Sequence, residues 1–345
     1  MLQDSASAEL ARKCIDNIYD LQFDDAREII TQLDRSYSEH PVVSLLSGIL
    51  TYWEKYPLVH TNPYHASFEN DMRQCIKLTE ENTHTENEVE YLLANLCARG
   101  MLLMFYADND LAMEVIPLAT SSYKYLMRSF DYNGSSIDLN YFTGIYNYYR
   151  EAYPRIYPIY KSLAFMFPQG DEEAGLKQLI KTSANSVLLR AEASFSLAWI
   201  FLYYENNYPE SLKYSKTLHE LYPRNLQYLA LYIKNLLLTK QYDEAEIFIS
   251  GWADDGTENY FQAQNCIFNG ILQEKKYKNL TLAKGYYNQG LADISYFGDY
   301  GNEYASYAYF GLSRISEVNN ERQAGKSYRR MAEKLNDFKK INFDK

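Results

Sequence analysis

One feature of the sequence constrains the fold more than any other: single glycines recur inside segments whose apolar spacing predicts helices. Gly48, Gly100, Gly270 and Gly311 hold equivalent places in four such segments. A glycine inside a helix costs about 1 kcal/mol relative to alanine, so a repeated one needs a packing reason. A close crossing with a second helix provides that reason, because a larger side chain would force the two helices apart. The sequence therefore predicts a series of closely crossing helix pairs.

Small residues also follow these glycines at the places where the crossing partner is expected. The predicted partners are Ala112 and Ala119 for Gly100, Ala283 and Gly290 for Gly270, and Ala324 with Tyr328 for Gly311. Near the start of the chain Cys14 takes the small place, and residues 23–27 (Phe-Asp-Asp-Ala-Arg) supply the turn. The same arrangement of small residues is thus predicted in both halves of the chain.

The clearest turn signals stand in the C-terminal half. Residues 208–214 read Tyr-Pro-Glu-Ser-Leu-Lys-Tyr, residues 242–246 read Tyr-Asp-Glu-Ala-Glu, and Pro223-Arg224-Asn225 closes the first of these units. Pro223 lacks a backbone N–H donor and pushes the residue before it out of the helix, so the chain turns into the next unit. These segments resemble the second helix of the tetratricopeptide repeat (TPR).

The TPR resemblance implies an all-α fold, a right-handed superhelical array of antiparallel helix pairs in a TPR-like solenoid. Units are predicted to start near residues 7, 41, 93, 191, 226, 263 and 304, with inserted turns at residues 56–65 and 252–259. The array is predicted to be continuous, with N-terminal helix pairs in residues 1–132 and C-terminal helix pairs in residues 185–345.

Residues 133–184 do not follow the repeat and are predicted to form an irregular helical insert. We expect a helix over 136–152, a break at Pro154 and Pro158, a helix to Phe167, a turn at 168–171, and a helix over 172–182 capped by Asp171.

This middle segment resembles part of the eukaryotic inclusion-clearance and mitochondrial-outer-membrane-associated TPR proteins. The matching residues are Gly144, Pro154, Phe165, Gly170, Asp171, Gly175, Leu176 and Leu179. The chain departs from that family at Glu172, where the family has arginine, and at Phe167, where it has glycine. The resemblance implies a protein of the interaction type and supplies no catalytic residue.

Charge and metal-ligating residues argue against several classes of protein. The formal net charge of −11 disfavours nucleic-acid binding, which needs Lys and Arg to displace counterions from phosphates. It also disfavours attraction to anionic lipid surfaces. Neither a zinc site, a disulfide framework nor a cofactor is expected, because the cysteines and histidines lack ligand spacing. These residues are Cys14, Cys75, Cys97, Cys266, His40, His60, His65 and His84.

The sequence gives no sign of membrane insertion. No apolar run reaches the roughly 18 residues that a membrane helix needs. The first residues turn polar directly after Met1-Leu2, unlike a basic and then apolar signal peptide. We expect a soluble protein, either cytoplasmic or, if a leader has been removed, exported. The compartment and the oligomeric state are left open.

Tyrosine is the compositional anomaly, with 35 of 345 residues. One interpretation is packing in helix seams, since tyrosine suits places that are apolar at one end and wet at the other. The other is an aromatic-lined concave groove on the first helix of each pair, where rigid rings bury area at low entropic cost. The groove candidates are Tyr19, Tyr52, Trp53, Phe105, Phe195, Trp199 and Tyr203.

These patterns favour a non-catalytic scaffold that binds a peptide or helical partner, of unknown identity, in its concave groove. The alternative is a small-ligand or glycan-binding protein that uses an aromatic-lined pocket. The sequence contains no Gly-rich phosphate loop, no Gly-x-Ser-x-Gly elbow and no His-Glu-x-x-His motif, so we predict that it is not an enzyme.

Overall fold

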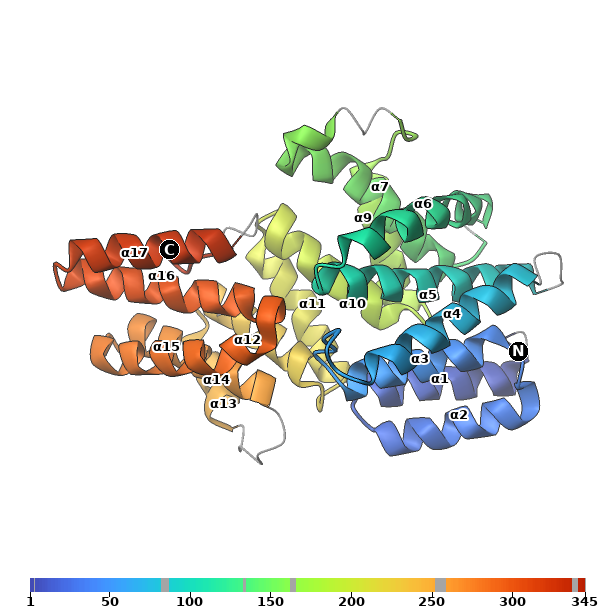
Figure 1. Cartoon of the computed structure of the whole chain (residues 1–345), viewed down its shortest axis with the longest axis horizontal. Helices are drawn as coiled ribbons and strands as arrows, with labels where there is room; N and C mark the ends of the chain where they lie inside the picture. The colour runs from blue at the N-terminus through green and yellow to red at the C-terminus, as the bar shows by residue number, and fades with distance from the viewer. Residues whose placement is uncertain are drawn as a thin grey trace. The chain divides into compact units, whose positions relative to one another are not determined.

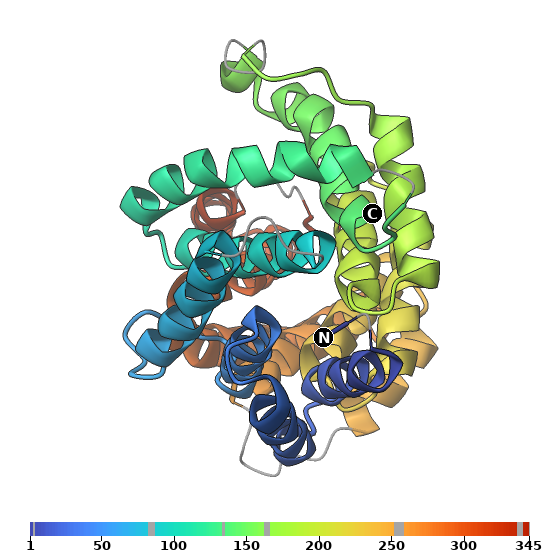
Figure 2. The ribbon, with the colours of Figure 1, turned by 90° about the vertical axis from the view of Figure 1, so that its right-hand side faces the viewer.

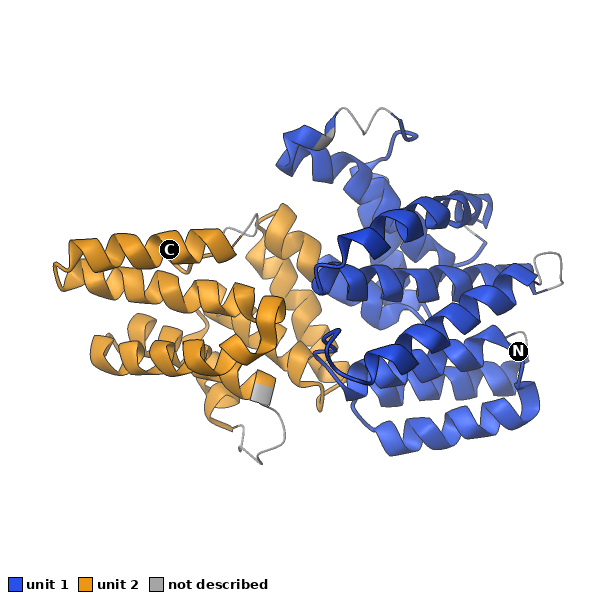
Figure 3. Ribbon diagram, viewed as in Figure 1, with its two compact units in different colours: residues 1–197 blue, residues 198–345 orange. Residues whose placement is uncertain are grey.

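The computed structural model describes residues 1–2, 4–81, 87–132, 135–161, 166–251, 259–336 and 341–344. Helices make up nearly all of these residues and no strand occurs among them, which confirms the predicted all-α class (Figure 1). The chain divides into two compact units, residues 1–197 and 198–345 (Figure 3). Each unit is described by itself below.

Unit 1 is a succession of helices in which, from α1 to α9, each packs against the next. Its α-helices are α1 (Ser5–Tyr19), α2 (Phe23–Tyr37), α3 (Pro41–Glu54), α4 (His65–Glu81), α5 (Glu88–Asp108), α6 (Ala112–Ser129), α7 (Leu139–Ile156), α9 (Glu172–Asn185) and most of α10 (Arg190–Trp199). The alternate helices α1, α3 and α5 also contact one another. Figure 2 shows these helices following a curved path, with the N-terminus on its inner side.

Unit 2 repeats this pattern. It contains the π-helical turn Ile200–Tyr204, α11 (Tyr208–Leu221), α12 (Leu226–Leu238), α13 (Tyr242–Gly251), α14 (Asn259–Lys275), α15 (Leu280–Ile294), α16 (Asn302–Val318) and α17 (Arg322–Leu335). Here α12 contacts α14, and α14 contacts α16. We call α1, α3, α5, α7, α10, α12, α14 and α16 the first helices, and the helix that follows each of them its second helix. Apart from α7, which lies in the predicted insert at 133–184, the first helices begin close to the predicted unit starts.

The turns inside the pairs share one backbone geometry that the sequence analysis did not predict. Six of the described turns have a left-handed residue standing two positions before the second helix begins. The next N–H then bonds back to the first helix, as Gln22 does to Asn17 at 2.8 Å and Gln241 to Leu236 at 2.9 Å. Such bonds satisfy carbonyls that the helix end leaves unpaired. The left-handed residues are Leu21, Asp110, Asn206, Lys240, Lys278 and Asn320.

Gly48 and Gly270 lie at close crossings with the following helix, as predicted, whereas Gly311 lies at a close crossing with a helix of the preceding pair. A Cβ atom added to Gly48 would come within 2.5 Å of Met72 on α4, and one added to Gly270 within 2.6 Å of the Tyr287 ring on α15. A Cβ atom on Gly311 would overlap the other side of the same ring. The close neighbour of Gly311 is therefore Tyr287 of the preceding pair, whereas Ala324 had been predicted.

The prediction for Gly100 is wrong. Gly100 is exposed, and among the described residues no heavy atom of another element lies within 4 Å of its Cβ position; Ala112 and Ala119 are exposed as well. The two helices meet elsewhere, where the Arg99 guanidinium donates to the Ser121 hydroxyl at 2.8 Å. The buried residues of α6 lie in its C-terminal half, so its first turns leave Gly100 uncovered.

Other crossings are marked by small side chains that donate to a carbonyl of the partner helix. Cys14 Sγ lies 3.6 Å from the carbonyl oxygen of Ala26, which confirms its predicted small place. Ser211 Oγ lies 2.8 Å from the carbonyl oxygen of Ala198. Side chains of this size let two backbones approach closely and still satisfy their own polar atom.

The middle segment contains a tightly crossed pair, α7 and α9. A Cβ atom on Gly175 would lie 2.7 Å from the backbone nitrogen of Tyr148, and one on Gly144 would lie 3.1 Å from the carbonyl oxygen of Gly175. The predicted cap is confirmed, since Asp171 Oδ1 accepts from the Ala174 N–H at 2.9 Å.

The predicted break at Pro154 is wrong, because α7 continues through it and ends at Ile156. The helix stops where Tyr157 takes a non-helical φ of −116° and ψ of 84° ahead of Pro158, as the residue before a proline tends to do. The expected helix that ends at Phe167 includes Phe165, which lies outside the described residues, as does most of the predicted insertion at 252–259. The insertion at 56–65 is confirmed as the connection between α3 and α4.

Candidate binding surfaces

Four of the predicted groove residues come together in unit 1. The rings of Tyr19 and Trp53 meet edge to face at 5.6 Å, and Trp53 lies 6.1 Å from Tyr52. Phe68 on α4 then links Tyr52, at 5.7 Å, to Phe105, at 5.2 Å. A continuous chain of aromatic contacts therefore joins α1, α3, α4 and α5.

Most of these rings pack inside the unit. Tyr19, Tyr52 and Phe105 are buried, with Phe105 completely inaccessible, so they belong to helix seams and present no ring to a ligand. Trp53 is half-buried, and Phe195 on α10 keeps 38% of its surface exposed. Of the groove candidates in unit 1, only Trp53 and Phe195 reach the surface.

Two first helices at opposite ends of unit 1, α1 and α10, are joined by polar contacts. The Tyr19 hydroxyl donates to the Glu192 carboxylate, and Asp16 lies 3.6 Å from the Arg190 guanidinium. Burial raises the pKa of Glu192 to about 7, despite the hydrogen bond from Tyr19. The second carboxylate oxygen of Glu192 is buried and has no hydrogen-bond partner among the described residues.

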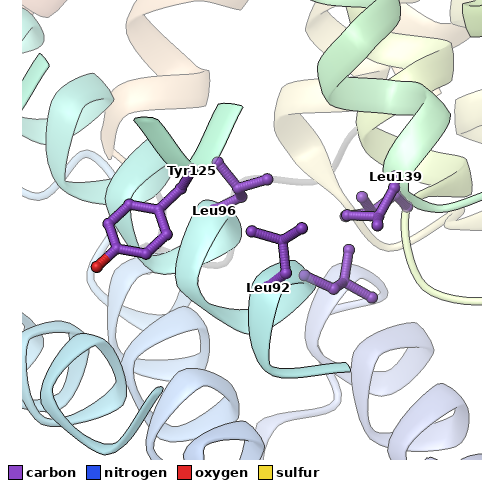
Figure 4. Packing of buried hydrophobic residues seen from close by; sticks show 6 residues of the cluster. Leu92, Leu96, Tyr125 and Leu139 are labelled. Atoms are coloured by element: carbon purple, nitrogen blue, oxygen red, sulfur yellow. The ribbon is translucent and has the colours of Figure 1, made fainter. Parts of the chain in front are cut away.

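A leucine-rich cluster is formed mainly by side chains of α5, α6 and α7. Figure 4 shows Leu92 and Leu96 of α5 packed with Tyr125 of α6 and Leu139 of α7. Leu2 packs against the cluster, and its N–H donates to both carboxylate oxygens of Glu90 at 3.0 Å. The first residues of the chain are therefore part of the packing of unit 1.

The two remaining groove candidates, Trp199 and Tyr203, contact each other in unit 2 at 4.3 Å between ring centres. Tyr203 is buried, and its hydroxyl bonds to the Glu303 carboxylate and to Lys234 Nζ, the latter at 2.8 Å. Lys234 Nζ also lies 3.0 Å from Glu303, and only 3% of the lysine side chain is exposed. This buried ion pair joins α12 to α16.

A second buried ion pair joins α14 to α16. Arg314 donates to both carboxylate oxygens of Glu274, at 2.6 and 2.8 Å, and the Tyr287 hydroxyl donates to the same carboxylate at 2.7 Å. Burial raises the pKa of Glu274, but the hydrogen bonds and charge of Arg314 outweigh it, so the pKa lies below its ordinary value. A bidentate contact of this kind fixes the orientation of the guanidinium.

The same guanidinium holds a segment near the C-terminus. Arg314 Nη1 donates to the carbonyl oxygen of Asn342 at 2.5 Å and to Asp344 Oδ1 at 2.9 Å. The Phe343 ring meets Tyr307 edge to face at 5.1 Å, and both Phe343 and Ile341 are buried. Residues 341–344, which we call the C-terminal segment, are not helical and lie against α16.

An open cleft of about 620 Å³ adjoins this place. It shares Arg314 and Glu274 with the contacts just described. The residues that line it are Glu274, Lys275, Lys278, Leu280, Arg314, Glu317 and Val318. Charged and aliphatic side chains thus line the cleft, and no aromatic ring is among them.

These buried polar groups were not among the predicted site residues. One signal was present, because Lys234 is the sole charged residue in the apolar sequence of α12, and a lysine in such a place needs a buried partner. No comparable signal pointed to Arg314, Glu274 or the C-terminal segment, whose contacts are distant in sequence.

No protein-family model matches the chain, and a search of curated proteins found no match. Within the part of the chain that the structure describes, no group of three or more His, Cys, Asp or Glu side chains could hold a metal ion. None of the described helices combines the length and apolar character needed to cross a membrane.

Proposed function

We propose that the chain is a non-catalytic scaffold, a right-handed superhelical array of TPR-like helix pairs that binds a protein or peptide partner on its first helices. Two kinds of observation support this. Six turns share one geometry, and alternate helices contact one another within each unit, as expected when repeated pairs stack. Stacked pairs present their first helices as one extended face, which is the surface that repeat proteins use for binding.

One observation carries the proposal: a first helix of this chain already holds a non-helical segment of the chain. Residues 341–344 lie against α16, with a buried aromatic side chain and a main-chain carbonyl bound by Arg314. Aromatic anchors and main-chain hydrogen bonds are the two kinds of contact by which proteins recognise extended peptides. The cleft beside Arg314 favours a polypeptide over a sugar, because its lining offers no aromatic face for stacking.

Capture of partners from a lysate of the source organism tests the proposal, with variants of first and second helices compared. Phe195→Ser changes an exposed ring on α10, and Val318→Asp changes an exposed residue at the end of α16. Leu282→Ser is the matched control, since Leu282 is exposed to a similar degree on a second helix, α15. We expect the first two variants to lose proteins that the wild type and the control capture. If all three variants capture the same proteins as the wild type, the first helices are not the binding face.

A further inference from the structure

The C-terminal segment has the anchors of a bound peptide. Ile341 is 1% exposed and Phe343 is 6% exposed, so two side chains on alternate residues are buried. The Phe343 ring meets Tyr307 on α16, and Asn336 Nδ2 donates to the carbonyl oxygen of Ile341 at 3.1 Å. Buried side-chain anchors of this kind, together with a bound main-chain carbonyl, are typical of a peptide that lies on a protein surface.

The receiving site is prepared by residues outside the segment. The Arg314 guanidinium donates to both carboxylate oxygens of Glu274, and this carboxylate also accepts a hydrogen bond from the buried Tyr287 hydroxyl. The bidentate contact with Glu274 fixes the orientation of the Arg314 side chain, which is only 18% exposed, while its Nη1 atom donates to the C-terminal segment. A fixed guanidinium selects for a ligand that presents a carbonyl and a carboxylate at the right separation, here Asn342 and Asp344.

The side chains of Phe343 and Asp344 differ in burial. The Phe343 ring is buried, whereas 36% of the Asp344 side chain is exposed, and Phe343 takes a left-handed φ of 55° that a non-glycine residue seldom adopts. A short segment held by few contacts and carrying such a residue opens at a lower free energy than the helices beneath it. Its release would leave Tyr307 and Arg314 accessible beside the open cleft.

We infer that the C-terminal segment is an intramolecular ligand that occupies a peptide site on α16. The partner that this site fits is a non-helical protein segment with an aromatic residue followed directly by an acidic residue. It binds in competition with the chain's own Phe343 and Asp344. The cleft of about 620 Å³ beside Arg314 is lined by Lys275 and Lys278 as well as by Glu274 and Glu317, and it leaves room for further residues of a partner. This inference rests on the proposed scaffold function and names the chemistry of its ligand.

Fluorescence anisotropy with a labelled peptide of residues 336–345 tests the competition on the full chain. A site occupied by its own segment for about nine-tenths of the time binds a free ligand about tenfold more weakly than an empty site. We expect Phe343→Ala protein to bind the peptide about tenfold or more tightly than the wild type does. Asp344→Asn protein should show a smaller gain. Tyr296→Ala is the control, since Tyr296 is an exposed aromatic residue of the same unit, and it should bind as the wild type does.

Variant peptides test recognition without altering the protein. Against Phe343→Ala protein, a peptide that lacks the Phe343 ring should not bind, and one with asparagine for Asp344 should bind more weakly. The inference is overturned if folded Phe343→Ala and Asp344→Asn proteins bind the peptide no better than the wild type. It is also overturned if the peptide without the ring binds equally well. A cellular partner captured equally by the wild type and Phe343→Ala would overturn this inference and leave the scaffold function standing.

Discussion

The packing of Tyr287 between two glycines allows a quantitative test of the close crossings. Gly270 on α14 and Gly311 on α16 face opposite sides of this ring, and a Cβ atom on Gly311 would overlap it. Tyr287 has no room to move, because it is fully buried and its hydroxyl is bound to Glu274. Overpacking of a core costs about 1–3 kcal/mol, and a clash without relief belongs at the upper end. The higher helix propensity of alanine offsets about 1 kcal/mol of this cost of about 3 kcal/mol. Gly311→Ala should therefore lower the free energy of unfolding by about 2 kcal/mol.

The matched control is Gly285→Ala, on the same helix as Tyr287. Gly285 is exposed and has no heavy atom of another element within 4 Å of a Cβ position, so only the propensity gain of about 0.5–1 kcal/mol applies. Gly100→Ala should stabilise unit 1 by the same amount. Urea unfolding followed by circular dichroism measures all three variants at constant m-value. If Gly311→Ala is as stable as Gly285→Ala, the crossing is looser than the structure indicates and the packing argument is refuted.

Two further predictions concern the buried charges. Glu192→Gln should gain stability over the wild type as pH rises. The pKa of Glu192 is about 7 in the folded protein and ordinarily 4.5, so the wild type alone loses up to about 3 kcal/mol of unfolding free energy between pH 4.5 and pH values above 7. Urea unfolding at pH 5 and pH 8 measures the difference in stability between the variant and the wild type. If this difference is the same at both pH values, the prediction is wrong. Lys234→Met should cost about 3–5 kcal/mol, because Glu303 keeps a buried charge without its cation, and adding Glu303→Gln should recover most of that loss in thermal unfolding. Equal stability of the single and double variants would count against the ion pair.

The sequence predicted the helices and many of their crossings because those depend on local spacing. Apolar periodicity and small residues locate α3, α12 and α14 and identify Gly48 and Gly270 as contact points. Gly100 shows the limit of this reasoning. Its place in the helix matches that of the other glycines, but the pairing of α5 with α6 is set by Arg99 and by residues in the second half of α6. A small residue permits a close crossing without requiring one.

The turns could not be predicted from their residues. Helix ends with a left-handed residue usually place glycine there, but these turns use Leu21, Lys240 and Lys278 among others. A non-glycine residue in that conformation costs roughly 1 kcal/mol, which the returning hydrogen bonds to the first helix offset. The repeated geometry therefore comes from the backbone demands of a short helical hairpin, and the amino acids at the turn merely tolerate it.

The groove residues illustrate a different limit. Register places Tyr19 and Phe195 on first helices, but it does not tell which side chains another helix covers. Tyr19 is buried because its hydroxyl reaches Glu192, 173 positions away in sequence, and Phe195, on the same helix as Glu192, remains partly exposed. Contacts over such separations follow from how the pairs stack, which local sequence does not determine.

The buried charges also bear on how a partner would bind. In unit 2, one helix, α16, uses Glu303 to hold Lys234 and Arg314 to hold Glu274, so most of its charge is satisfied within the chain. A ligand gains little from groups that are already paired and buried, because breaking them leaves a charge uncompensated. Of the groups that α16 presents, the Nη1 atom of Arg314 and the ring of Tyr307 contact the C-terminal segment, whereas Glu317 and Val318 are exposed at the end of the helix. A partner that binds at Arg314 and Tyr307, as proposed above, would exchange with that segment, so its affinity would depend on how often the segment is released.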